Sequence, residues 1–183
     1  MLEWLIPLIT IVLIGIIAFY YYNRFAVLSN RIKNSLSQID VQLKRRADLI
    51  PNLVEVVKGF AKHEKSAIKA VVEARKALVG SKGVEQKIKA NGTLEMALGR
   101  LFAIAENYPD LKANTNFLEL QRELSSTEDR VAYSRQFYND SILTYNNLCT
   151  TFPGKLFAGI FGKQEKEYLR IAESERKLPK VEF

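Results

Sequence analysis

The chain begins with a long apolar run. No charged residue occurs from Trp4 to Tyr22. A stretch of about 18 or more such residues can cross a bilayer as a helix, and tryptophan and tyrosine at its ends favour the membrane interface. A cleaved signal peptide is the alternative, but the chain starts Met1-Leu2-Glu3 and lacks a small-residue cleavage site after the run. We therefore predict a retained, transmembrane signal-anchor over residues 1–23.

Basic residues follow the apolar run, and none precedes it. Arg24, Arg31 and Lys33 come soon after the run, whereas Glu3 lies before it. Because the basic flank of a membrane helix stays in the cytoplasm, we expect a single-pass protein with its N-terminus outside and its remaining residues inside. The single Cys149 cannot form an internal disulfide, which suits a reducing compartment.

Beyond the anchor, apolar residues recur at helical spacing. They fall on one face of a helix that continues the anchor, at Phe25, Leu28, Ile32, Leu36, Ile39 and Leu43. Gly80–Gly83 interrupts the pattern, and a shorter helix ends before Pro109. Alternating strand patterns are absent. The sequence predicts an all-α fold, in which the N-terminal transmembrane helix continues into an antiparallel four-helix bundle with long helices over residues 24–151.

Pro51 leaves two interpretations of residues 48–53. Proline cannot donate a backbone hydrogen bond, but it can begin a new helix capped by Asp48. The first interpretation is a turn between two antiparallel helices, residues 23–48 and 51–79. The second is a kink within one very long helix, since the apolar register continues past Pro51. Because the two segments would match at about 40 Å each, we expect the turn.

The last long helix carries a seven-residue repeat of large side chains. Such a repeat is typical of a supercoiled helix that packs along its whole length, and its members are Phe117, Leu124, Val131, Tyr138, Tyr145 and Phe152. Asn114 or Asn116 would cap this helix. An aromatic binding stripe of Tyr133, Tyr138 and Tyr145 is an alternative that the period alone cannot support.

No catalytic, metal-binding or cofactor-binding signature is found. The sequence has no Gly-rich phosphate loop, Cys-x-x-Cys or G-x-S-x-G motif. His63, the one histidine, lies beside Glu64, and one histidine is too few for a zinc or di-iron bundle. The net charge of +7 is mixed with acidic residues along the helices, which favours solvated faces over a nucleic-acid site. We predict a non-enzymatic protein with no catalytic residue, metal or cofactor.

The C-terminal tail, residues 152–183, differs from the rest of the chain. Residues 152–162 are apolar and glycine-rich but too short to span a bilayer, and residues 163–177 are charged and typical of a helix. An exposed apolar stretch usually contacts lipid or protein. The basic flanks are weak for lipid binding, so we expect an oligomer contact rather than a lipid contact for Leu156, Phe157, Ile160 and Phe161.

Several segments, in order along the chain, resemble the LemA family. They include residues 38–54, A-K-H-E (61–64), A-E-N-Y-P-D-L-K-A-N (105–114), N-F-L-E-L-Q-R-E-L (116–124) and F-P-G (152–154). The resemblance implies a non-enzymatic helix bundle on an N-out anchor in the bacterial cytoplasmic (inner) membrane. The family-signature positions, with structural or interaction roles, are Arg46, Asp48, Pro51, His63, Glu64, Glu106, Tyr108, Asp110, Asn114, Asn116, Phe117, Arg135, Tyr138 and Asn139.

The role of the polar residues at packing positions stays open at this point. Arg46, Asp48, Arg135 and Asn139 would form either an internal network that fixes helix register or a site for a ligand or partner. For the whole protein we expect a membrane-anchored scaffold that contacts lipid, forms a homo-oligomer, binds no nucleic acid and serves in membrane organisation or remodelling. The alternative is an adaptor or regulatory module for an integral membrane partner or a membrane protease.

Overall fold

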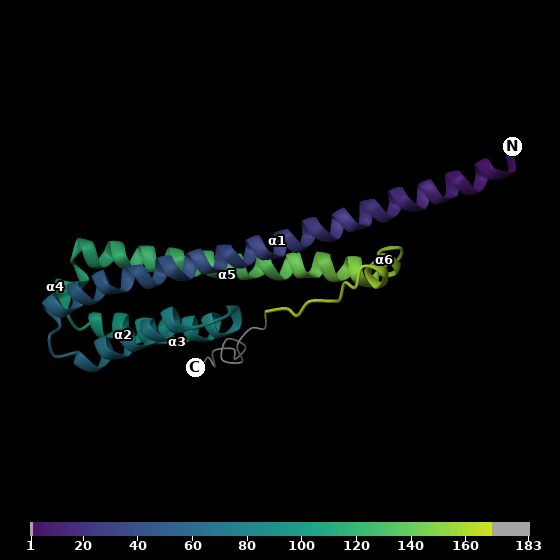
Figure 1. The fold of residues 1–183 in the computed structure, drawn as a ribbon. Coiled ribbons are helices and arrows are strands. Elements are labelled where there is room, and N and C mark those ends of the chain that lie inside the picture. The colour runs from purple at the N-terminus through teal and green to yellow at the C-terminus, as the bar shows by residue number, and fades with distance from the viewer. Residues whose placement is uncertain (1, 170–183) are drawn as a thin grey trace, which may run out of the picture. The chain divides into compact units, whose positions relative to one another are not determined.

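The computed structural model describes residues 2–169, which contain six α-helices and no strand (Figure 1). The all-α prediction is confirmed. Residues 170–177, part of the predicted charged helix, lie outside the described residues. The helices are α1 (Leu2–Phe60), α2 (Lys65–Gly80), α3 (Val84–Ala105), α4 (Pro109–Lys112), α5 (Thr115–Thr150) and α6 (Gly154–Ile160).

The described chain divides into two compact units, and α1 and α5 contribute to both. The first unit contains residues up to 36 together with residues 136–169. The second unit contains residues 37–135.

In the first unit, the start of α1 presents apolar side chains that no part of the described chain covers. Every large apolar side chain from Trp4 to Tyr22 is exposed, except that of Tyr21. This stretch is long and apolar enough to cross a membrane by length and composition. As predicted, it continues into the following helix without a break.

The core of the first unit lies between α1 and the second half of α5. The rings of Phe25 and Tyr145 meet edge to face, with centroids 5.8 Å apart. Further along, the hydroxyls of Ser35 and Ser141 lie 3.3 Å apart and both residues are fully buried. Small side chains let two helix backbones approach closely. The order of these pairs shows that the two segments are antiparallel.

Helix α6 packs its aromatic residues against the end of the apolar run. The ring of Phe157 stacks on that of Tyr21 with centroids 4.8 Å apart, and Phe161 meets Tyr22 edge to face at 5.5 Å. Gly154, the last residue of the F-P-G motif, is buried, and a Cβ there would collide with the backbone carbonyl oxygen of Leu148. The motif is therefore a packing requirement.

The predicted seven-residue repeat of α5 is confirmed except at its end. Phe117, Leu124, Val131 and Tyr145 are buried, and Tyr138 is partly buried. Phe152 is 81% exposed because α5 ends at Thr150, so its place in the repeat was wrong.

Residues 163–169 are not helical, which contradicts the predicted charged helix over that stretch. The chain leaves α6 through Gly162, whose φ of 61° is left-handed. Lys163 N–H then donates to Ala158 O at 2.8 Å, which closes a glycine-terminated helix end.

The N-cap of α5 is settled by one hydrogen bond. Asn114 Oδ1 accepts from the backbone N–H of Phe117 at 3.0 Å, and Asn116 lies exposed within the first turn. A side-chain oxygen at this position satisfies a backbone donor that the helix leaves unpaired. Asn114 is therefore the cap, and the alternative at Asn116 is wrong.

The predicted turn at residues 48–51 is wrong, because α1 continues through Pro51 to Phe60. The chain turns ten residues later, over residues 61–64. Pro51 removes the N–H that would bond to the carbonyl of Ala47 four residues earlier. In the structure Arg75 Nε donates to that carbonyl oxygen at 2.7 Å. A side chain from α2 thus satisfies the acceptor that the proline frees, and α1 needs no break there.

This compensation predicts energetic coupling between Arg75 and Pro51. Arg75→Met is expected to lower the free energy of unfolding by about 1–3 kcal/mol, because the Ala47 carbonyl loses its partner. In a Pro51→Ala background the restored N–H bonds to Ala47, so the same substitution should cost about 1 kcal/mol less. Urea unfolding of the detergent-solubilised protein, followed by circular dichroism, measures the cycle.

The control is Lys76→Met, which alters the exposed neighbour of Arg75. Lys76 forms an exposed ion pair with Glu73 at 3.0 Å, and the loss of this pair should not depend on residue 51. Additive effects of Arg75→Met and Pro51→Ala would contradict the compensation.

Candidate functional site

The most buried charged group of the second unit is Arg46 on α1. Its side chain is 2% exposed. Nη1 donates to Asn91 Oδ1 of α3 at 3.3 Å, and Nη2 lies 3.6 Å from Glu128 Oε2 of α5. One guanidinium therefore joins three helices of this unit. The alternative of an internal network, rather than a ligand site, fits these contacts, because a buried charge is tolerated when it is paired.

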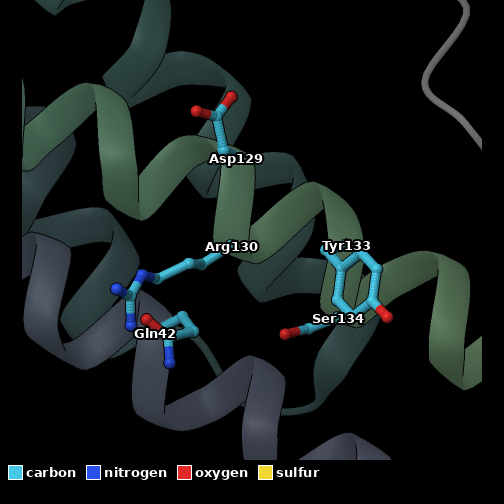
Figure 2. Close-up of a pocket in the computed structure, with 5 residues that line it drawn as sticks. All are labelled: Gln42, Asp129, Arg130, Tyr133 and Ser134. Atoms are coloured by element: carbon cyan, nitrogen blue, oxygen red, sulfur yellow. The ribbon is translucent and has the colours of Figure 1, made fainter.

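The network around Arg46 leaves two polar atoms unpaired within residues 2–169. Arg46 Nε and Gln42 Oε1 are buried and have no hydrogen-bond partner there. Gln42 also lines a shallow hollow with Asp129, Arg130, Tyr133 and Ser134 (Figure 2). The hollow carries both charge signs and no nucleophile-and-base arrangement, so it does not resemble a catalytic pocket.

A second tie connects the α1–α2 turn to the link between α3 and α4. Tyr108 Oη donates to Glu64 Oε1 at 2.9 Å. The hydrogen bond to Glu64 is the main cause that raises the pKa of the Tyr108 phenol, and desolvation is the second cause. His63 beside it is exposed. Of the signature pair His63 and Glu64, the glutamate therefore makes the structural contact.

The remaining signature residues are spread over the fold. Asp48 and Glu106 are exposed and form ion pairs with Lys44 and Lys112. Asp110 lies in the first turn of α4. Phe117 is buried and meets Phe102 edge to face. Arg135 is partly buried.

The alternative of an aromatic stripe on α5 does not fit the burial of its members. Tyr133 is 72% exposed, Tyr138 is partly buried and Tyr145 is buried in the first unit's core. Three side chains in such different surroundings do not present one binding surface.

The first unit contains a polar arrangement that sequence reasoning found only in part. Asn146 Nδ2 donates to Lys166 O at 2.9 Å, and Asn146 Oδ1 accepts from Lys166 N at 2.8 Å. Asn139 makes the same pair of bonds to Leu169, at 3.1 Å and 2.9 Å. We call Asn139 and Asn146 the asparagine clamp. Asn139 was among the signature residues, whereas Asn146 was given no role, although its spacing of seven from Asn139 was a usable signal.

Several other functional partners were also missed. Asn91 was not among the sequence-predicted site residues, yet it is buried inside α3, where it accepts from Arg46. Glu128 and Arg75 were not predicted as contact residues either, because a charged residue on a helix usually lies on a solvated face. Their partners come from other helices, which no local pattern reveals.

The described residues offer binding groups rather than reactive ones. No group of three or more His, Cys, Asp or Glu side chains within residues 2–169 could hold a metal ion. Burial, chiefly, raises the pKa of the Cys149 thiol, which disfavours the reactive thiolate. The asparagine clamp can bind backbone groups, which is the chemistry that these residues offer.

The role of Arg46 can be separated from that of its neighbour Arg45. Arg46→Met should lower the free energy of unfolding by about 1–3 kcal/mol, because buried Asn91 loses its partner. Arg45→Met is the matched control. It removes an exposed pair to Glu123 at 3.8 Å and should cost less than about 1 kcal/mol. Urea unfolding compares the two, and equal losses would contradict a structural role for Arg46.

Comparison with known proteins gives a consistent result. The LemA family model matches residues 35–183. Magnetosome protein MamQ of Magnetospirillum gryphiswaldense is 30% identical over 173 residues, covering 80% of this chain and 64% of that protein. Magnetosome protein MamQ 2 of Paramagnetospirillum magneticum is 29% identical over 175 residues, with 81% and 64% covered.

A relative that carries the family name agrees. Protein LemA of Metamycoplasma hominis is 27% identical over 151 residues, covering 80% of this chain and 66% of that protein. The chain thus spans just under two thirds of the length of these relatives. Since the family model covers most of the residues that follow the apolar run, the chain belongs to the LemA family.

Proposed function

We propose that this protein is a non-enzymatic, membrane-anchored helical scaffold that self-associates on the cytoplasmic side of a bacterial inner membrane. The observation that carries the proposal is the packing of α6 on the end of the apolar run. Tyr21 stacks on Phe157, and Tyr22 meets Phe161. The same helix α1 then continues into the bundle without a flexible linker. The end of the apolar run and the segment around α6 therefore pack together within the first unit.

Helix α6 supplies the contact with the membrane surface. Phe157 of α6 and Phe161, which follows the helix, pack inside the chain, whereas Leu156 and Ile160 are exposed. Leu156 and Ile160 lie four residues apart and so share one face. Tyrosines at the end of a membrane helix prefer the level of the lipid headgroups. A lipid contact for Leu156 and Ile160 follows, in place of the oligomer contact that the sequence favoured.

The relatives support a role at membranes. Three of them are named magnetosome proteins. The described residues of this chain offer packing and hydrogen-bonding surfaces, which suit organisation of a membrane better than chemistry on a substrate. A scaffold needs more than one contact per copy, and self-association gives each copy a contact with another copy in addition to its contact with the membrane.

The measurement that tests self-association is the mass of the full-length protein. We expect a dimer or a larger assembly in mild detergent and in lipid nanodiscs, read by light scattering and mass photometry. The control is dilution over about two orders of magnitude, which separates specific association from crowding in micelles. A monomer at every concentration would contradict the scaffold and favour the adaptor for an integral membrane partner.

The proposed orientation has its own test. Protease added to intact spheroplasts should leave a C-terminal tag untouched, because Arg24, Arg31 and Lys33 hold the basic flank inside. Permeabilised cells, in which the tag should be cut, serve as the control. Cleavage of the tag in intact spheroplasts would show that the C-terminus lies outside, and it would leave the proposed self-association untested by this experiment and unchanged.

A further inference from the structure

The asparagine clamp recognises a peptide by its backbone alone. Each of its two asparagines pairs with the N–H and the C=O of one residue in the extended segment 163–169. The register matches this use. Seven residues of α5 rise by about 10 Å, and three extended residues span about 10 Å as well. Asn139 and Asn146 therefore meet Leu169 and Lys166 without distortion of either chain.

Side chains of the segment contribute little to this recognition. Lys166 Nζ lies 5.3 Å from the centre of the Tyr145 ring, a weak cation–π contact. Residues 163–168 are otherwise exposed. Because the clamp bonds to backbone groups, any copy of the same extended segment can satisfy the same four hydrogen bonds.

The direction of the segment depends on one glycine. Gly162 has a φ of 61°, a conformation that other residues adopt only under strain. It reverses the chain so that residues 163–169 run back along α5. A hinge of a single residue next to a short, exposed segment is the arrangement from which identical elements exchange between copies.

We propose that two copies of this protein exchange segment 163–169, so that the segment of each copy occupies the asparagine clamp of the other. The inference rests on the self-association proposed above and names its contact. A two-fold exchange fills both clamps and leaves no open end. Anchoring in one bilayer raises the concentration of one copy around the other, which favours the exchange over the internal contact.

A complementation experiment with the full-length protein tests the exchange. Asn139→Asp with Asn146→Asp removes the amide donors of the clamp and keeps the segment. Lys166→Pro with Leu169→Pro removes the two N–H donors of the segment and keeps the clamp, and an extended backbone tolerates proline. Each variant alone should lose the dimer. An equimolar mixture should recover a heterodimer, because one intact clamp meets one intact segment.

Matched controls introduce the same number of Asn→Asp or proline substitutions at positions that the clamp contacts do not use. Asn34→Asp with Asn147→Asp changes two exposed asparagines of the same unit. Glu165→Pro with Glu167→Pro places one proline on each side of Lys166, at positions whose N–H groups the clamp does not bond. Both controls should dimerise as the wild type does. Helicity by circular dichroism and labelling of the single Cys149, which lies buried beside Glu165 and Lys166, report whether the unit stays folded and the clamp stays filled.

Gly162→Ala should act in the opposite direction. Strain at this residue penalises the chain reversal, so the dimer fraction should rise at equal concentration.

In the complementation experiment, a tag on one of the two mixed variants, with light scattering of the eluate, identifies the heterodimer.

The outcomes separate the two proposals. If the wild type is monomeric, both the exchange and the scaffold fail. If the wild type assembles, and the clamp variant and the segment variant each assemble equally well alone, the exchange fails and the scaffold stands. If both variants are monomeric alone and in the mixture, the segment acts only within its own chain and the exchange is overturned.

Discussion

The continuity of α1 depends on a hydrogen-bond donor for one backbone carbonyl group, that of Ala47. Pro51 removes the backbone donor for Ala47, and a helix would ordinarily kink or end there. Arg75 reaches from α2 and donates to that carbonyl at 2.7 Å. As a result α1 runs from Leu2 to Phe60, and its residues enter the cores of both units. The first turn of the fold consequently falls at residues 61–64 instead of at the proline.

Polar contacts between helices complement the apolar cores. Arg46 joins α1 to Asn91 and Glu128, and Tyr108 ties Glu64 to the link after α3. Buried polar groups gain little net energy, but leaving one of them unpaired is costly. They therefore select one register among the several that apolar helix faces would allow. The polar signature residues Arg46, Glu64 and Tyr108 thus each make a contact between segments of the second unit.

The first unit combines an apolar helix long enough to cross a membrane with a surface that binds backbone groups. Phe157 of α6 stacks on Tyr21, and Phe161 after α6 meets Tyr22 edge to face, which holds this segment against the end of the apolar run. Gly154 permits that approach, because any side chain there would meet the Leu148 carbonyl. The chain then passes through Gly162 to the asparagine clamp. Each of these steps depends on close packing or on hydrogen bonds to the backbone.

Local patterns in the sequence determined the all-α class, the apolar segment, its continuation into α1 and most of the repeat on α5. Each follows from the spacing of apolar residues, which is a property of neighbouring positions. The family relationship was also present in short ordered motifs. The asparagine cap of α5 was predicted up to a choice between Asn114 and Asn116, which one hydrogen bond decided.

Only the tertiary structure decided the position of the first turn, the partners of Arg46 and the role of Asn146. Pro51 predicts a break when it is considered alone, because the residue that compensates for it lies 24 positions away at Arg75. Residues 163–169 have a helix-like composition, yet they are extended because the clamp on α5 bonds to their backbone. Sequence patterns report what a segment prefers by itself, whereas contacts between distant segments determine which preference is overridden.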